Sequence, residues 1–379
     1  MKKLTLIICE IAILLLTAII LAPTIVTAAE NESRIIVDDT HIGTSTGNLL
    51  PLCEIITHIG GTVAWSGTAQ EITIRRGSLT AILTIDEPKV TINNRNIVLA
   101  TPPALIEGQV MVSLCFLANH LGLGAGHKNN SFILSTNPAR QIPILIYHHI
   151  LPDEVNTHFR DNPWTVSAEN FAAQMRYLSD NGFYTPTLDE LEAFLYNGRP
   201  LPANSVMIHF DDGYYSNYVY AYPILLKYGL RAVLFPITAY AKALGDYQPP
   251  ICHNSLTKTA AVTLRTSSDV FETASHTHNL HSFQPDTLDS VLLAASREDI
   301  IEDMLQSFEF VSNHRAFAFP FGQLNTTITD AIAAAGITMA FTTRAGYVTN
   351  TSDPLRLNRF TVYQGTTIER FRAIVNRRV

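Results

Sequence analysis

The segment NSVMIHFDDGY, residues 204–214, runs from an apolar stretch directly into two aspartates and a glycine. A short, mostly apolar run such as the one from Val206 to Phe210 is typical of a strand buried in a parallel sheet. The aspartates come where such a strand ends, so it would carry two carboxylates to one edge of the sheet. Asp-Asp-Gly is also ordinary turn chemistry, and taken alone it assigns no function.

Similar apolar strands recur along the second half of the chain. They lie at residues 142–147, 231–237, 269–275, 315–320 and 338–343. Helical patterns separate most of them; in one, Ser167 is a plausible cap and Gly182 a plausible stop. This alternation predicts an α/β domain of parallel strands wrapped by helices. A (β/α) barrel is the leading architecture, and a doubly wound open sheet is the alternative.

Several of these strands end in titratable or unusual residues. His148 and His149 follow the first strand, three histidines lie within residues 276–281, and Pro-Phe-Gly occupies residues 320–322. In a parallel barrel the carboxyl ends of the strands converge on one face, where active sites are built. These segments and the two aspartates are therefore expected to share one pocket.

Histidines and carboxylates at one pocket indicate metal-assisted hydrolysis. Two histidines and one carboxylate can hold a divalent ion with open positions, which lowers the pKa of bound water and polarises a carbonyl. Hydrolysis of an amide or an ester is the natural reaction for that set. Spacing leaves the histidine pair open. His276 and His278 face one side of a continuing strand, whereas His276 and His281 converge only if the chain bends.

The first part of the chain is organised differently. Its basic start, apolar run and small residues predict a signal peptide or an uncleaved membrane anchor, and therefore export. Residues 50–74 resemble residues 112–134, and each copy predicts a short helix, a polar turn and a strand. The net charge of −7, without a basic stripe, argues against a nucleic-acid partner. The predicted parts are an export segment (1–29), a small α+β domain (33–136), a polar linker (136–141) and the α/β domain (142–379).

Three motifs in order resemble those of the polysaccharide deacetylases with a NodB-type domain, carbohydrate esterase family 4. HFDDGY (209–214) is similar to the first motif, and FPFG (319–322) to the third. SHTHNLH (275–281) is similar to the longer second motif of the poly-N-acetylglucosamine deacetylase branch. The resemblance implies a distorted barrel. Residues 33–136 resemble the stalk-like N-terminal module of copper amine oxidases, which implies spacing, cell-wall or envelope attachment or partner contact, and does not imply copper.

The resemblance also implies a role for each motif residue. Asp212, His276 and His281 would bind the metal, and His278 would fall at a variable position. Asp211 would be the general base, and His148 the general acid, with His149 as its competitor. The backbone N–H of Phe321 would hold the oxyanion, with Tyr214 and Pro320 beside the substrate.

Two departures from the family pattern stand out. Ala318 lies near the place where many members carry an arginine that orients the base. Many members also take the catalytic acid from a histidine close to the C-terminus, whereas no histidine follows His314 in this chain. The metal would be zinc foremost, with iron, cobalt or nickel as alternatives. The resulting hypothesis is a secreted or envelope-associated enzyme that removes acetyl groups from an N-acetylglucosamine-type polysaccharide. The alternatives are a carbohydrate-binding protein with reduced turnover and an O-acetyl esterase acting on another glycan.

Overall fold

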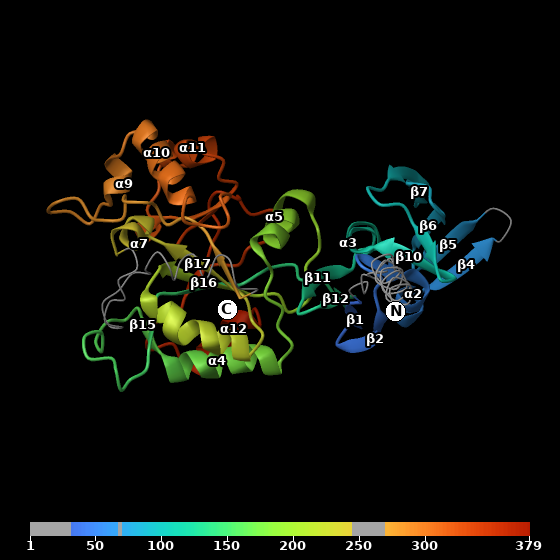
Figure 1. The fold of residues 1–379 in the computed structure, drawn as a ribbon, viewed down its shortest axis with the longest axis horizontal. Coiled ribbons are helices and arrows are strands. Elements are labelled where there is room, and N and C mark those ends of the chain that lie inside the picture. Colours follow the sequence, from blue (N-terminus) through green and yellow to red (C-terminus); the bar gives the residue numbers. More distant parts are fainter. Residues whose placement is uncertain (1–31, 67–69, 245–269) are drawn as a thin grey trace, which may run out of the picture.

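A computed structural model describes residues 32–66, 70–244 and 270–379. The expected export segment, residues 1–29, lies outside the described residues. Two bodies follow each other along the chain (Figure 1), a smaller N-terminal domain and a larger C-terminal domain. Among the described residues, none of the helices combines the length and the apolarity needed to cross a bilayer.

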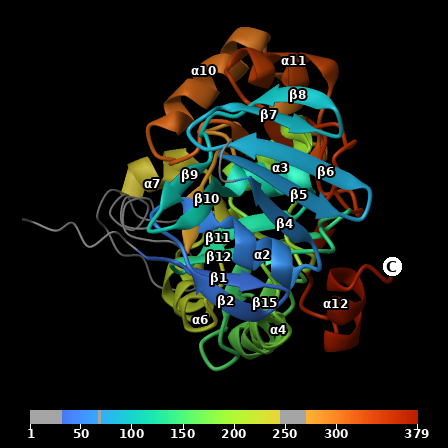
Figure 2. The ribbon, with the colours of Figure 1, turned by 90° about the vertical axis from the view of Figure 1, so that its right-hand side faces the viewer.

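The N-terminal domain contains three sheets and two short helices. One sheet has the order β11-β12-β1-β2, the second β3-β10-β9, and the third is an antiparallel run from β4 to β8. Figure 2 views this domain from its free end, with β5 to β8 side by side. Its elements are β1 (Arg34–Val37), β2 (Thr40–Thr44), β3 (Leu49–Pro51), α2 (Leu52–His58), β4 (Thr62–Ser66), β5 (Glu71–Arg76), β6 (Leu79–Thr84), β7 (Lys89–Ile92), β8 (Arg95–Val98), β9 (Ala104–Ile106), β10 (Gln109–Ser113), α3 (Leu114–Leu121), β11 (Gly124–Lys128) and β12 (Ser131–Ser135).

The repeat predicted from the sequence corresponds to helices α2 and α3, each followed by a hairpin. Helix α3 ends at Gly122, which adopts a left-handed conformation with φ 69°. In the second copy the predicted polar turn lies at Asn129 and Asn130, before β12. The pattern missed strands β4 and β11, which follow the two helices. Both strands pair antiparallel with the next strand, so each copy is a helix and two strands.

The C-terminal domain is built on parallel strands, as predicted. Five strands form one sheet in the order β18-β17-β16-β13-β21, and every pairing in it is parallel. Parallel bridges from Ser275 to Phe317 and from Phe341 to Leu357 link this sheet to the β19-β20 pair on both sides. The strands are β13 (Ile144–Tyr147), β14 (His149–Leu151), β15 (Thr165–Ser167), β16 (Met207–Asp212), β17 (Ala232–Pro236), β18 (Phe271–Thr273), β19 (Ala316–Ala318), β20 (Met339–Phe341) and β21 (Phe360–Thr361).

Helices cover these strands where the sequence predicted them. The Ser167 hydroxyl caps α4 by accepting from the Asn170 N–H, and Thr187 forms a capping box with Glu190 at the start of α5. The apolar face of α4 is fully buried against the sheet. The helices are α4 (Ala168–Asp180), α5 (Leu188–Asn197), η1 (Asn217–Ala221), α6 (Tyr222–Lys227), α7 (Thr238–Leu244), α9 (Val291–Ala294), α10 (Arg297–Phe308), η2 (Pro320–Gly322), α11 (Thr326–Ala334) and α12 (Ile368–Val375).

The two domains touch through strand β11. The Ala125 N–H donates to the Pro200 carbonyl at 3.0 Å. A β-carbon on Gly126 would collide with the ring of Tyr184. The Tyr184 hydroxyl accepts from the His127 N–H at 3.0 Å and donates to the Glu190 carboxylate. The predicted linker is also in contact, because Ala139 pairs with Leu201 and is buried.

Candidate active site

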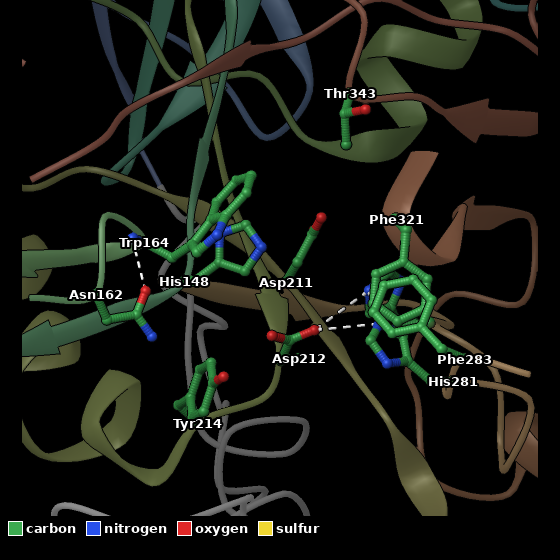
Figure 3. Close-up of a pocket in the computed structure, with 11 residues that line it drawn as sticks. His148, Asn162, Trp164, Asp211, Asp212, Tyr214, His281, Phe283, Phe321 and Thr343 are labelled. Carbon is green, nitrogen blue, oxygen red and sulfur yellow. Dashed lines mark hydrogen bonds and ion pairs between the residues drawn. The ribbon is translucent and has the colours of Figure 1, made fainter. Parts of the chain in front are cut away.

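A cavity of about 440 Å³ opens at the carboxyl ends of β13 and β16 and the loops that follow β18 and β19. In Figure 3, His148 and Trp164 lie on one side of the two aspartates, and His281 and Phe321 lie on the other. The lining residues are His148, Asn162, Trp164, Asp211, Asp212, Tyr214, His276, His281, Phe283, Phe321 and Thr343.

Asp212, His276 and His281 bring three potential metal ligands together. The Asp212 Oδ1 atom lies 3.4 Å from the Nε2 atom of each histidine. The two Nε2 atoms are 3.1 Å apart. The His276 Nδ1 atom lies 2.7 Å from the Ala318 carbonyl and therefore donates its hydrogen there. That contact leaves the Nε2 lone pair facing the other two ligands, as in metal-binding histidines.

The charges around this triad are consistent with a cation site. Burial lowers the pKa of His281 to about 4, helped by its neighbour His276. Burial acts against a charged His276 too, but the Asp212 and Asp211 carboxylates outweigh it and raise the pKa of His276. A divalent cation would satisfy both lone pairs and the carboxylate at once, so this donor set fits one.

Asp211 is held by an arginine that the motifs did not reveal. Burial alone would raise the pKa of Asp211, yet Arg359 and the nearby His276 lower it to about 2. The two guanidinium nitrogens of Arg359 donate to both carboxylate oxygens at 2.8 and 2.7 Å. Arg359 is fully buried, and its Nε donates to the Thr342 carbonyl. The arginine missing at Ala318 is thus supplied from just before β21, within the stretch PLRLNRFTV.

The two candidate acids occupy different environments. His148 lines the cavity and packs on Trp164, with ring centroids 4.7 Å apart. Burial lowers the pKa of His148, although the Asp212 and Asp211 carboxylates oppose this effect. His149 turns away, with its Nδ1 atom 2.6 Å from the Ser216 hydroxyl and its ring stacked on Tyr214. Of the two histidines, His148 is the one that lines the cavity together with Asp211 and Asp212.

The Pro-Phe-Gly turn closes the other side of the cavity. Phe321 has a φ of 57°, and its ring stacks on Phe283 with centroids 3.9 Å apart and lies against His281. Gly322 is required, because its φ is 69° and a β-carbon there would collide with Thr343. Tyr214 lines the cavity as expected, with its pKa raised by burial and by Asp212. Pro320, expected beside the substrate, is buried and does not line the cavity.

His278 lies outside the cavity and anchors the loop between His276 and His281. Its Nδ1 atom is 2.9 Å from the Thr238 hydroxyl. The backbone N–H groups of His278 and Asn279 donate to the two oxygens of Asp303, at 2.6 and 2.7 Å. Thr277, between the histidines, has a φ of 75°. This bend is what lets His281 turn back to His276.

Asp303 is a site residue that sequence reasoning missed. It is buried on α10 together with Ile300, Met304 and Ser307. A carboxylate on the apolar face of an amphipathic helix is the signal that could have revealed it, because a buried charge needs partners. Asn162, Trp164, Phe283 and Thr343 lie in loops, where the sequence gives no spacing to place them.

Comparisons with known proteins find relatives for both domains. Residues 198–340 match the polysaccharide deacetylase family, and residues 34–133 match the copper amine oxidase N-terminal domain. Over 261 residues the chain is 26% identical to a poly-beta-1,6-N-acetyl-D-glucosamine N-deacetylase of Staphylococcus epidermidis, covering 64% of this chain and 86% of the relative.

Two solved structures resemble the C-terminal part. The Streptococcus pyogenes deacetylase PplD in complex with acetate matches with a TM-score of 0.53 and 26% identity, covering 63% of this chain and 99% of that chain. IcaB from Ammonifex degensii shares the fold, with a TM-score of 0.52 and 23% identity, covering 63% of this chain and 97% of that chain. The family expected from the motifs is thereby confirmed. Residues 198–340 thus form a polysaccharide deacetylase domain, the domain of carbohydrate-deacetylating hydrolases, and a copper amine oxidase N-terminal domain precedes it at residues 34–133.

Proposed function

We propose that the protein is an exported, metal-dependent deacetylase that hydrolyses the N-acetyl groups of an N-acetylglucosamine polymer. One observation carries this proposal: Asp212, His276 and His281 converge beside the Arg359-bound Asp211, with His148 on the opposite side of the same cavity. The substrate named for the Staphylococcus epidermidis relative supports the choice of polymer.

Each group has one task in the proposed reaction. A divalent ion held by Asp212, His276 and His281, with zinc the foremost candidate, would lower the pKa of a water molecule and polarise the acetyl carbonyl. Asp211 takes the proton from the attacking water, and its lowered pKa keeps it ionised for that task. The Phe321 N–H donates to the oxyanion. His148 gives a proton to the departing amine.

The proposal extends to the architecture and the location. We take the ring of pairings from β13 through β18, β19 and β20 to β21 as the distorted barrel of this family. Such a barrel gathers strand ends on one face, where the cavity lies. We also propose that the enzyme is extracytoplasmic, either secreted or attached to the envelope, where it would meet its polymer.

Acetate release from β-1,6- and β-1,4-linked N-acetylglucosamine oligomers tests the proposal. The wild type should release acetate, a chelator should stop the release, and Asp211→Asn should lower it by several orders of magnitude. Asp330→Asn, on the exposed side of α11, is the matched control and should keep full activity. Absence of chelator-sensitive release from every oligomer would exclude the proposed function. His148→Ala should lose far more activity than His149→Ala.

A further inference from the structure

A second cavity of about 490 Å³ adjoins the active-site cavity. It lies between β21 and the start of α12 and shares Thr343 with the first cavity. Tyr363 lines the second cavity, and its ring contacts the ring of Trp164 in the first, with centroids 5.1 Å apart. The two cavities therefore meet at Thr343 and at this aromatic pair.

The lining of the second cavity suits a sugar ring. The Thr366 hydroxyl accepts from the Tyr363 N–H at 2.9 Å, and the Thr367 hydroxyl accepts from the Arg370 N–H at 3.2 Å. Each hydroxyl keeps its own hydrogen for a further partner. Trp164 and Tyr363 are 38% and 44% exposed, so they offer aromatic surface to the apolar C–H faces of a sugar.

The charges of the two cavities are opposite. Asp211 and Asp212 line the first. Arg370 lines the second, and none of the described residues that line it carries a carboxylate. Within the described parts of the chain, the Arg370 guanidinium forms no ion pair. A neutral sugar therefore fits beside Arg370, whereas a sugar with a free ammonium group would be repelled.

We propose that the second cavity binds the sugar unit next to the one being deacetylated, and that Arg370 selects a neighbour that still carries its acetyl group. This inference rests on the proposed function. A newly formed ammonium group could not move into this cavity without repulsion. The enzyme would then produce fewer consecutive free amines than a deacetylation that ignores the neighbouring unit.

Oligomers of N-acetylglucosamine with one free amine at a defined position test this selection. The wild type should have a higher kcat/KM for the fully acetylated oligomer than for the oligomer whose neighbouring unit is free. We expect a difference of about two- to fivefold, as for exposed charges. Arg370→Gln should remove this preference and Arg370→Glu should reverse it. Arg372→Gln, on the same helix but outside the cavity, should leave it unchanged.

The experiment distinguishes failure of this inference from failure of the proposed function. Equal preferences in the wild type and both Arg370 variants would overturn the inference, even with high activity. Mass spectrometry of the products should show fewer adjacent free amines with the wild type than with Arg370→Glu, and an identical distribution would count against it in the same way. Absence of acetate release from all oligomers would instead reject the proposed function.

Discussion

The N-terminal domain and the cavity end of the C-terminal domain use left-handed backbone for different purposes. In the N-terminal domain most non-glycine residues in this conformation form Asp or Asn pairs in tight turns between antiparallel strands, at 38–39, 93–94 and 129–130, and Gln70, Asp86 and Glu107 adopt it singly. Asn and Asp tolerate this conformation, so these turns follow local preference. At the cavity, Asp212, Thr277 and Phe321 adopt it, and threonine and phenylalanine do so at a cost. A β-branched residue and an aromatic residue, Thr277 and Phe321, thus hold strained backbone beside the candidate metal ligands.

The two regions also differ in the polar side chains that they bury. Among its described residues, the N-terminal domain buries only serines as polar side chains: Ser33, Ser45, Ser131 and Ser135. The cavity end buries Asp211, Arg359, His209 and His276. An apolar core tolerates the loss of a surface charge, whereas a buried ion pair depends on both partners. Substitutions should therefore have larger effects at the cavity.

The largest effect is expected for Arg359→Met. The substitution leaves Asp211 buried without its cation, which should cost about 3–5 kcal/mol in the free energy of unfolding and abolish acetate release. Urea unfolding and the acetate assay measure both effects. Arg344→Met, at an exposed residue in the neighbouring loop, is the control and should change neither. A loss of stability no larger than that of the control would show that the pair is not needed.

Glu272→Gln should stabilise the protein in a pH-dependent way. Burial raises the pKa of Glu272 from 4.5 to about 7, against the hydrogen bond that its carboxylate accepts from the Leu188 N–H. The folded state thus binds more protons than the unfolded state between about pH 4.5 and 7, so stability falls as the pH rises through that window. Glutamine keeps an acceptor and carries no charge.

Thermal unfolding at several pH values measures this difference. The Glu272→Gln variant should gain up to roughly 3 kcal/mol over the wild type at pH 8 and almost nothing at pH 4.5. Glu298→Gln, exposed at the start of α10, should show no such trend. A gain that is the same at both pH values would contradict the raised pKa.

Asp303→Asn should weaken metal binding without touching a ligand. Asparagine offers one acceptor oxygen where Asp303 offers two, so the loop from His276 to His281 loses one of its two anchors. We expect zinc affinity to fall about 10- to 100-fold, as for other supporting contacts. Competition with a chromophoric chelator measures it. Glu302→Gln, the exposed neighbour on α10, should bind zinc like the wild type.

These residues also mark how far the sequence could predict the molecule. The parallel strands and the caps of α4 and α5 follow from local patterns, because periodicity and strand ends are visible in the chain. The pairing of His276 with His281 instead came from the resemblance to the family motif, because spacing left it open. Arg359 was not predicted as a partner of Asp211. The two are 148 positions apart, and only the return of the chain to β13 through β21 brings them together. Asp303 could not be predicted as a partner of the loop from His276 to His281, because no spacing in the sequence specifies where that loop lies.

The smallest effect, and the most direct test of the two uses of left-handed backbone, is expected from a pair of glycine substitutions. Asn94→Gly, in the β7-β8 turn, should change stability by only a few tenths of a kcal/mol, because both residues accept a φ of 65°. Thr277→Gly should stabilise the protein by roughly 1 kcal/mol, since it removes a strained β-branched residue and a buried hydroxyl with no partner among the described residues. The same substitution should lower acetate release several-fold, because the bend between His276 and His281 is then less firmly held.

Equal stability changes at the two positions would mean that the cavity carries no more backbone strain than a hairpin. A stabilised Thr277→Gly variant with undiminished activity would mean that the strain has no part in aligning the ligands.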